Sequence, residues 1–216
     1  MMKKILVIIL SIGFLSVNAQ YDKKAKEILD KVSAKNKAFT TERVEFLYIQ
    51  ENINDKTKTV KNGTLLLKAT KYKLDLMGNS IYCDSKTLWS YVKENNEVNV
   101  SNVADQEGSL LNPAKVFTMY EKGFKYKLIR EKFENNRSVY EIELYPEKVG
   151  ESEFSKVRLL IDKDKMQLYL VQYFAKDANR VTIEIQKITP NETVADNTFT
   201  FDKTKYPKVE VVDMRQ

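Results

Sequence analysis

The residue types that most often carry out chemistry in proteins are almost missing from this chain of 216 residues. It contains no histidine and a single cysteine, Cys83. Histidine is the commonest general base and a common metal ligand, so a Ser-His-Asp triad, a Cys-His pair and a histidine-rich zinc site are excluded. Carboxylate or lysine chemistry stays open, but no spacing points to it, and the six glycines form no phosphate-binding loop. We therefore expect no enzyme, no metal site and no cofactor.

The charged residues argue against a nucleic-acid-binding protein. Thirty-six lysines and arginines face 30 aspartates and glutamates, which gives a formal net charge of +6. The two signs alternate along the chain and form no basic block, a pattern typical of a solvated surface. We expect no nucleic acid among the partners.

The N-terminus has the three parts of a secretory signal peptide. Two lysines precede an apolar run over residues 5–17, and Ala19 precedes the expected cleavage site. A membrane anchor is the alternative, but the run is shorter than the about 20 apolar residues that a membrane span needs. No cysteine follows the cleavage site, so no lipid anchor is expected there. We predict a signal peptide at residues 1–19 and a single exported domain at 20–216.

Two helical segments are predicted at either side of a group of strands. Asp22 is a suitable N-cap for a helix over residues 22–36, whose apolar residues recur at helical spacing. A second helical segment covers residues 112–122, where Asn112 is the cap and Pro113 the first position.

Most of the remaining chain alternates between apolar and polar residues, which predicts strands. Turn residues separate about ten to twelve short strands at regular spacing, the first near Val44–Gln50 and the last near Val209–Val212. This pattern predicts a mainly β protein with an antiparallel sheet. Two short helices cover only part of so wide a sheet, so a filled sandwich core and a sheet that encloses a ligand cavity both stay open.

One hairpin resembles a known family of proteins. Residues 84–91 read Asp-Ser-Lys-Thr-Leu-Trp-Ser-Tyr, after a strand at 71–76 and before a strand at 97–100. This order resembles the LolA family of periplasmic lipoprotein carriers, in which an Arg-Pro-x-x-Phe strand is followed by a DGKTLWxY hairpin. The ending around Phe199 and Phe201, the leading helix and the N-terminal signal are also similar. The hairpin is the only sharp motif, while the order of elements matches over nearly the whole chain.

The resemblance implies an unclosed antiparallel β-barrel with a lid of short α-helices over its concave face. Such a protein acts as a soluble periplasmic chaperone that carries lipoproteins, by their acyl chains, from the inner to the outer membrane. Its partners would be lipoproteins, an inner-membrane exporter and an outer-membrane acceptor, and we expect a monomer. A periplasmic module that binds or senses a different amphipathic ligand is the alternative.

The resemblance also assigns candidate residues. Those expected to line the lipid-binding cavity are Phe46, Tyr48, Leu66, Tyr72, Leu74, Leu76, Trp89 and Tyr91. Those expected in the lid are Val116, Phe117 and Tyr120. For each of them ordinary core packing is the alternative.

Three positions depart from the family pattern. Lys68 and Ala69 occupy the places of the family's arginine and proline, and Ser85 replaces the glycine of the hairpin. The arginine is associated with holding the lid closed, so Lys68 is the candidate latch. Lysine keeps the charge but lacks the planar group with several donors that arginine provides.

Overall fold

The structure is a computed structural model that describes residues 22–106, 116 and 118–215. The predicted signal peptide lies outside the described residues, as do residues 112–115 and 117 of the predicted helical segment at 112–122. The helical elements are α1 (Lys23–Lys37) and the short 3-10 turns η1 (Val103–Gln106), η3 (Met119–Glu121), η4 (Asp196–Phe199) and η5 (Lys203–Lys205). The strands are β1 (Glu42–Asn52), β2 (Thr57–Lys68), β3 (Lys71–Leu76), β4 (Asn79–Cys83), β5 (Thr87–Val92), β6 (Glu97–Asn102), β7 (Phe124–Glu134), β8 (Arg137–Pro146), β9 (Phe154–Asp162), β10 (Gln167–Ala175), β11 (Asn179–Pro190) and β12 (Glu210–Asp213).

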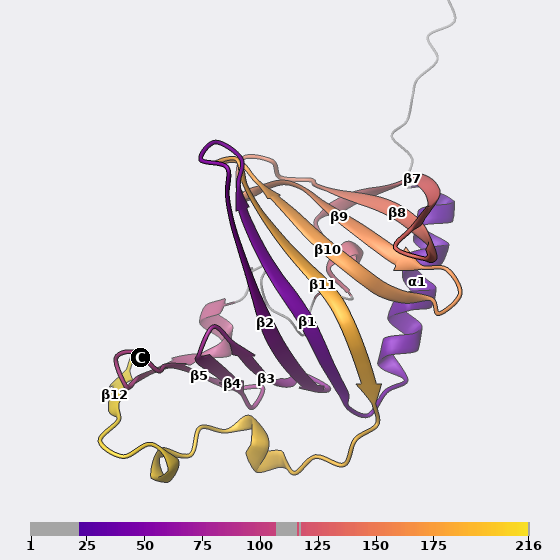
Figure 1. Cartoon of the computed structure of the whole chain (residues 1–216). Helices are drawn as coiled ribbons and strands as arrows, with labels where there is room; N and C mark the ends of the chain where they lie inside the picture. The colour runs from indigo at the N-terminus through magenta and orange to yellow at the C-terminus, as the bar shows by residue number, and fades with distance from the viewer. Residues whose placement is uncertain (1–21, 107–115, 117, 216) are drawn as a thin grey trace, which may run out of the picture.

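The twelve strands form one curved, unclosed sheet (Figure 1). Its order is β12-β6-β5-β4-β3-β2-β1-β11-β10-β9-β8-β7. Consecutive strands pair antiparallel within β1–β6 and within β7–β11, and the long antiparallel pair β1–β11 joins these two halves of the sheet. Only β12, which pairs with β6, runs parallel to its neighbour. The prediction of a mainly β fold with an unclosed antiparallel sheet is therefore confirmed.

Helix α1 begins at the predicted cap and packs against the β7 end of the sheet. The Asp22 carboxylate accepts a hydrogen bond from the Ala25 backbone N–H at 3.0 Å, as an N-cap does. Its other oxygen accepts from the Leu128 N–H at 2.9 Å and so ties the helix to β7. The buried face of the helix joins the main apolar cluster and consists of Ala25, Ile28, Leu29 and Val32.

Alternation along each strand defines an inner and an outer face of the sheet. The inner face carries Val44 and Phe46 of β1 and Leu74 and Leu76 of β3, and these belong to or pack against the main apolar cluster. The outer face carries the residues between them, such as Lys73. On this outer face Lys73 pairs with Tyr82 of β4. Tyr82 pairs with Trp89 of β5, which pairs with Val100 of β6.

A bulge in β10 reverses its alternation. Leu168 pairs with Ile161 and Leu170 with Leu160, which leaves Tyr169 as an extra residue between the two pairs. Leu168 and Val171 therefore both reach the inner cluster. Tyr169 and Leu170 belong to a separate small cluster of buried residues.

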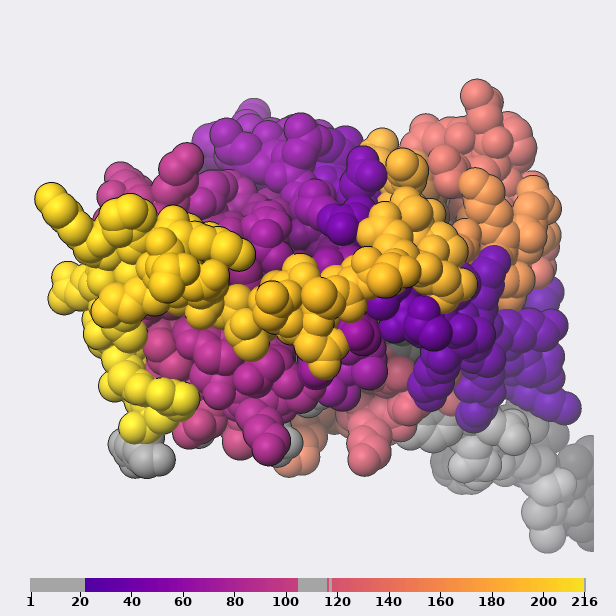
Figure 2. Space-filling view, turned by 90° about the horizontal axis from the view of Figure 1, so that it is seen from below, coloured from indigo at the N-terminus to yellow at the C-terminus, as the bar shows by residue number. Residues whose placement is uncertain are grey.

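The segment from residue 191 onward crosses the outer face of β3–β6 and ends as β12 on the edge of the sheet (Figures 1 and 2). Its aromatic residues Phe201 and Tyr206 stack on each other, with ring centroids 4.7 Å apart. The Tyr206 ring lies 4.4 Å from that of Tyr91, and its hydroxyl is 2.8 Å from that of Tyr82. This C-terminal segment therefore buries the outer face of the hairpins, as helix α1 buries part of the inner face.

Candidate functional site

A cavity of about 300 Å³ lies on the inner face of the sheet, between β1–β4 and β10–β11. Every described residue that lines it is aliphatic or aromatic: Val44, Phe46, Tyr48, Leu65, Leu74, Leu76, Ile81, Val116, Leu168, Val171, Tyr173, Val181, Ile183 and Ile185. Apolar walls of this kind bind by contact area and provide few directional bonds. The cavity suits an apolar ligand, and its wall does not distinguish ligands by their detailed sequence or shape.

The strand register explains how residues distant in sequence meet here. Val44 pairs with Leu65 of β2, which in turn pairs with Leu74 of β3. On the other side, Tyr48 of β1 pairs with Ile183 of β11. Because cross-strand partners point to the same face, one row of apolar side chains runs across several strands.

The Phe46 ring lies flat across Gly63 on the neighbouring strand. A Cβ atom at Gly63 would lie 2.3 Å from Phe46 Cζ, closer than real Cβ contacts come. Glycine at this position therefore provides the space for an aromatic side chain on the cavity wall.

The two tyrosine hydroxyls in the wall stay neutral at physiological pH. Burial raises the pKa of Tyr173 to about 12, and it also raises the pKa of Tyr48. The Tyr48 hydroxyl donates a weak hydrogen bond to Gln50 Oε1 at 3.4 Å. The part of the cavity wall that the structure describes consequently carries no charge.

Five of the residues predicted for the cavity or its lid line it: Phe46, Tyr48, Leu74, Leu76 and Val116. Tyr72 lies on the same face and is buried in the main cluster, but it packs beside the cavity and does not line it. Burial raises the pKa of the Tyr72 hydroxyl well above its ordinary value.

The predicted places of Leu66, Trp89 and Tyr91 are wrong. Leu66 pairs with Arg43 and Lys73 on the outer face, while its neighbour Leu65 lines the cavity. Trp89 and Tyr91 belong to the cluster beneath the C-terminal segment. These two aromatic residues are buried by a segment that packs on the opposite face, which the alternation of β5 does not reveal.

The cavity residues that the sequence analysis missed come mainly from β10 and β11. They are Leu65, Leu168, Val171, Tyr173, Val181, Ile183 and Ile185, with Val44 and Ile81 completing the wall. The period-two pattern of Val181, Ile183 and Ile185 was a usable signal, since it marks one common face. The pattern does not say that β11 is the neighbour of β1.

Of the three residues predicted for the lid, Val116 and Tyr120 are among the described residues. Tyr120 lies in the short turn η3, is buried, and donates a hydrogen bond to Asp30 Oδ1 of α1 at 3.0 Å. Phe117 lies outside the described residues. In the described part of 112–122, the helical structure is limited to this 3-10 turn at Met119–Glu121.

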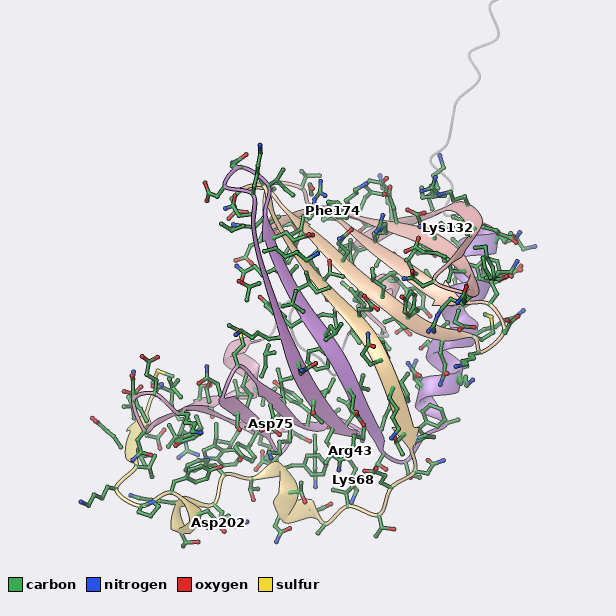
Figure 3. The ribbon with its side chains drawn as sticks, in the orientation of Figure 1. Arg43, Lys68, Asp75, Lys132, Phe174 and Asp202 are labelled. Carbon is green, nitrogen blue, oxygen red and sulfur yellow. The ribbon has the colours of Figure 1, made fainter. Side chains whose placement is uncertain are left out.

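Lys68, the predicted latch, is bound by the C-terminal segment. Its ammonium donates to Asp196 Oδ1 at 2.7 Å and to the Val194 carbonyl at 3.1 Å. Lys71 holds the other oxygen of Asp196 at 2.7 Å. The pair of lysines therefore fastens the C-terminal segment to the end of β2, where Figure 3 shows Lys68 next to that segment.

Two of the three departures from the family pattern coincide with an unusual backbone conformation. Ala69 has φ 54° and Ser85 has φ 87°, in the left-handed region. A proline is fixed near φ −65° and therefore does not fit the conformation of Ala69. Ser85 takes a conformation that favours glycine, and its hydroxyl lies 2.7 Å from that of Thr70.

Two kinds of feature are absent from the part of the chain that the structure describes. No group of three or more Asp, Glu, Cys or His side chains is arranged to hold a metal ion. Within the same residues, no helix combines the length and apolar character needed to cross a membrane.

Comparisons with known proteins identify relatives of this fold. The family model for outer membrane lipoprotein carrier protein LolA matches residues 15–153. An uncharacterized protein of Methanocaldococcus jannaschii is 26% identical over 200 residues, which cover 91% of this chain and 57% of that protein. The chain thus spans little more than half the length of this relative.

One solved structure shares the fold at low sequence identity, and a second resembles the chain more weakly. An uncharacterized conserved protein from Thermus thermophilus superposes with a TM-score of 0.60 at 12% identity, covering 88% of this chain and 99% of that one. A putative outer membrane lipoprotein-sorting protein domain from Vibrio parahaemolyticus gives a TM-score of 0.47 at 10% identity, covering 81% and 95%. Likeness at these identities concerns the fold alone.

Proposed function

The chain belongs to the LolA family of outer membrane lipoprotein carrier proteins, and we propose that it binds the acyl chains of lipoproteins in its apolar cavity. In this proposal it is exported after removal of residues 1–19 and acts as a monomer in the periplasm. It takes lipoproteins from an exporter in the inner membrane and passes them to an acceptor in the outer membrane.

The uncharged wall of the cavity is the observation that supports this proposal most strongly. Its residues expose almost only carbon to a space of about 300 Å³, at the lower end of the range for ligand pockets. Each CH₂ group of an acyl chain that leaves water gains about 0.8 kcal/mol. A wall without charges or directional bonds collects that gain from any acyl chain, whichever protein the chain is attached to.

The same wall accounts for release without an energy source. A second apolar surface offers the acyl chain the same kind of contact. An acceptor with a larger apolar surface therefore binds the acyl chain in preference to this cavity. A carrier that held its cargo by buried ion pairs would lose this property, because a bare charge in the empty cavity is costly.

A release assay tests the proposal. Inner-membrane vesicles bearing a labelled lipoprotein and its exporter are incubated with the protein lacking residues 1–19, and the supernatant is tested for a soluble complex. The wild-type protein is expected to release the lipoprotein. If it releases none but still binds fatty-acid derivatives, the alternative holds, namely a lipid-binding module with another amphipathic ligand.

A matched pair of variants relates release to the cavity. Leu74→Asp places a carboxylate in the cavity wall, whereas Val60→Asp makes the same kind of change at an exposed position of β2. A buried, unpaired charge costs several kcal/mol, so Leu74→Asp should reduce release at least about tenfold. Val60→Asp should release like the wild type, and thermal melting of both variants checks that they fold. Equal release by the two variants would contradict the proposed site.

A further inference from the structure

A second cavity continues the inner face beyond the apolar one. It has a volume of about 490 Å³ and lies where the end of α1 meets the beginning of β1 and the end of β2. Its wall exposes mostly carbon but includes the polar side chains of Asn36 and Lys37 of α1, Glu42 of β1, and Lys68 of β2. None of these side chains has a part in the proposed binding of acyl chains.

Three buried polar side-chain atoms in this wall lack a hydrogen-bond partner in the part of the chain that the structure describes. Glu42 is 4% exposed, and its Oε1 atom makes no hydrogen bond within the part of the chain that the structure describes. The same holds for Asn36 Nδ2 and for Ser33 Oγ. Buried polar groups in proteins are nearly always paired, so an unpaired acceptor and an unpaired donor in one cavity call for an explanation.

The lysines in the wall do not neutralise Glu42. Lys37 pairs with Glu121 at 3.2 Å, and Lys68 pairs with Asp196 at 2.7 Å. Burial alone raises the pKa of the Glu42 carboxyl to about 7. An uncompensated carboxyl group therefore lies at one end of the inner face. Burying it lowers the stability of the fold, which a merely structural role does not explain.

The two cavities are close enough for one molecule to occupy both. Glu42 precedes Val44 by two residues on the same face of β1, and Leu67 follows Leu65 on β2. The register pairs Glu42 with Leu67 and Val44 with Leu65. Two residues along a strand span about 7 Å, the length of a few CH₂ groups.

We propose that this second cavity binds the amide group from which an acyl chain extends, while the chain itself lies in the apolar cavity. The amide N–H donates to Glu42 Oε1, and the amide carbonyl accepts from Asn36 Nδ2. An ester has the carbonyl but no donor, so it leaves Glu42 unpaired. The inference rests on the proposed binding of acyl chains and adds to it the chemical class of the linkage.

Two sources provide such a group: an N-acylated amino terminus and a free fatty amide. The probes for a test are N-palmitoylglycinamide for the first, palmitamide for the second and methyl palmitate as the ester without a donor. Each is titrated against the protein loaded with the uncharged fluorophore N-phenyl-1-naphthylamine, and displacement gives the relative affinity.

The wild-type protein should bind at least one of the two amides about tenfold more tightly than the ester, as a recovered buried hydrogen bond implies. Glu42→Leu should lose this preference while its affinity for methyl palmitate stays the same. Glu42→Gln, which keeps an accepting oxygen, should retain part of the preference. Glu45→Leu on the outer face of β1 is the matched control and should bind like the wild type. A preference for N-palmitoylglycinamide indicates an acylated amino terminus, and a preference for palmitamide alone indicates a free amide.

Two results are unfavourable and are distinguishable. If amides and ester bind equally to the wild type, or if Glu42→Leu and Asn36→Ala both keep the preference, the inference about the amide is overturned and acyl binding stands. If none of the three probes displaces the fluorophore, the proposed function itself fails. Glu42→Leu removes a buried carboxyl, so loss of folding is not expected, and its melting curve provides the check.

Discussion

Replacing Glu42 by glutamine is expected to change the stability of the protein in a way that depends on pH. The carboxyl is buried and faces Lys37 of α1 and Lys68 of β2, both of which are paired with other residues. Burial raises its pKa from 4.5 to about 7. The folded state therefore holds this proton more tightly than the unfolded state does.

The sign and the size follow from this difference. Below about pH 4.5 the carboxyl is protonated in both states, and the wild type pays no electrostatic penalty. As the pH rises from 4.5 to about 7, the unfolded glutamate ionises first, so the wild type loses stability relative to Glu42→Gln. At about 1.4 kcal/mol for each pH unit, the loss reaches about 3 kcal/mol and is constant above pH 7.

Urea denaturation at pH 4 and pH 8 measures this effect. The quantity of interest is the stability of Glu42→Gln minus that of the wild type, which should be about 3 kcal/mol larger at pH 8. Any cost of burying the glutamine amide itself is the same at both pH values and cancels. Glu45→Gln, whose side chain is 49% exposed, is the control and should change by less than about 0.5 kcal/mol. A stability difference for Glu42→Gln that does not vary with pH would refute the reasoning.

Three further predictions concern the neighbourhood of the cavity. Gly63→Ala should cost about 1–3 kcal/mol of stability in urea denaturation, because the new Cβ would lie 2.3 Å from Phe46 Cζ and displace the ring; an unchanged midpoint would contradict this. Trp89→Ala should lower stability by about 2 kcal/mol and leave the affinity for N-phenyl-1-naphthylamine unchanged, since Trp89 lies beneath the C-terminal segment; a tenfold weaker affinity would place it in the cavity after all. Asp196→Asn should speed hydrogen exchange in residues 191–206 above pH 4, because the hydrogen bonds from Lys68 and Lys71 that lower the Asp196 pKa to about 2 are weakened. In the wild type that fastening persists above the ordinary pKa of 3.8 and is lost as the pH falls through about 2, so equal exchange in both proteins at neutral pH would contradict its role.

The alternation of apolar and polar residues predicted the inner face of a strand correctly wherever one face of that strand is apolar and the other polar. The inward placement of Leu74 and Leu76 follows from their alternation with Lys73 and Asp75. The start of α1 likewise follows from Asp22, whose side chain caps the helix without help from distant residues. For these elements local chemistry and tertiary structure agree.

Pattern failed where both faces of a strand are buried. The run Leu65-Leu66-Leu67 has no polar residue to mark the outer face, and only the register with β1 shows that Leu66 points outward. The alternation of β5 likewise does not show which face Trp89 and Tyr91 occupy, because the C-terminal segment buries that face as well.

The sequence by itself determined the fold class, the leading helix and the absence of histidine-based chemistry, because these depend on residue types and on periods of a few residues. The resemblance carried by the hairpin around Leu88 was also in the sequence, and it is confirmed at the level of the family. The tertiary structure decided which apolar residues share the cavity, since the β1–β11 pairing joins strands more than a hundred residues apart. It also decided the place of Glu42, a single carboxylate that no local pattern distinguishes from the other acidic residues until α1 and β2 close over it. Burial is a property of the whole assembly of strands, so the groups that it makes unusual become visible only in three dimensions.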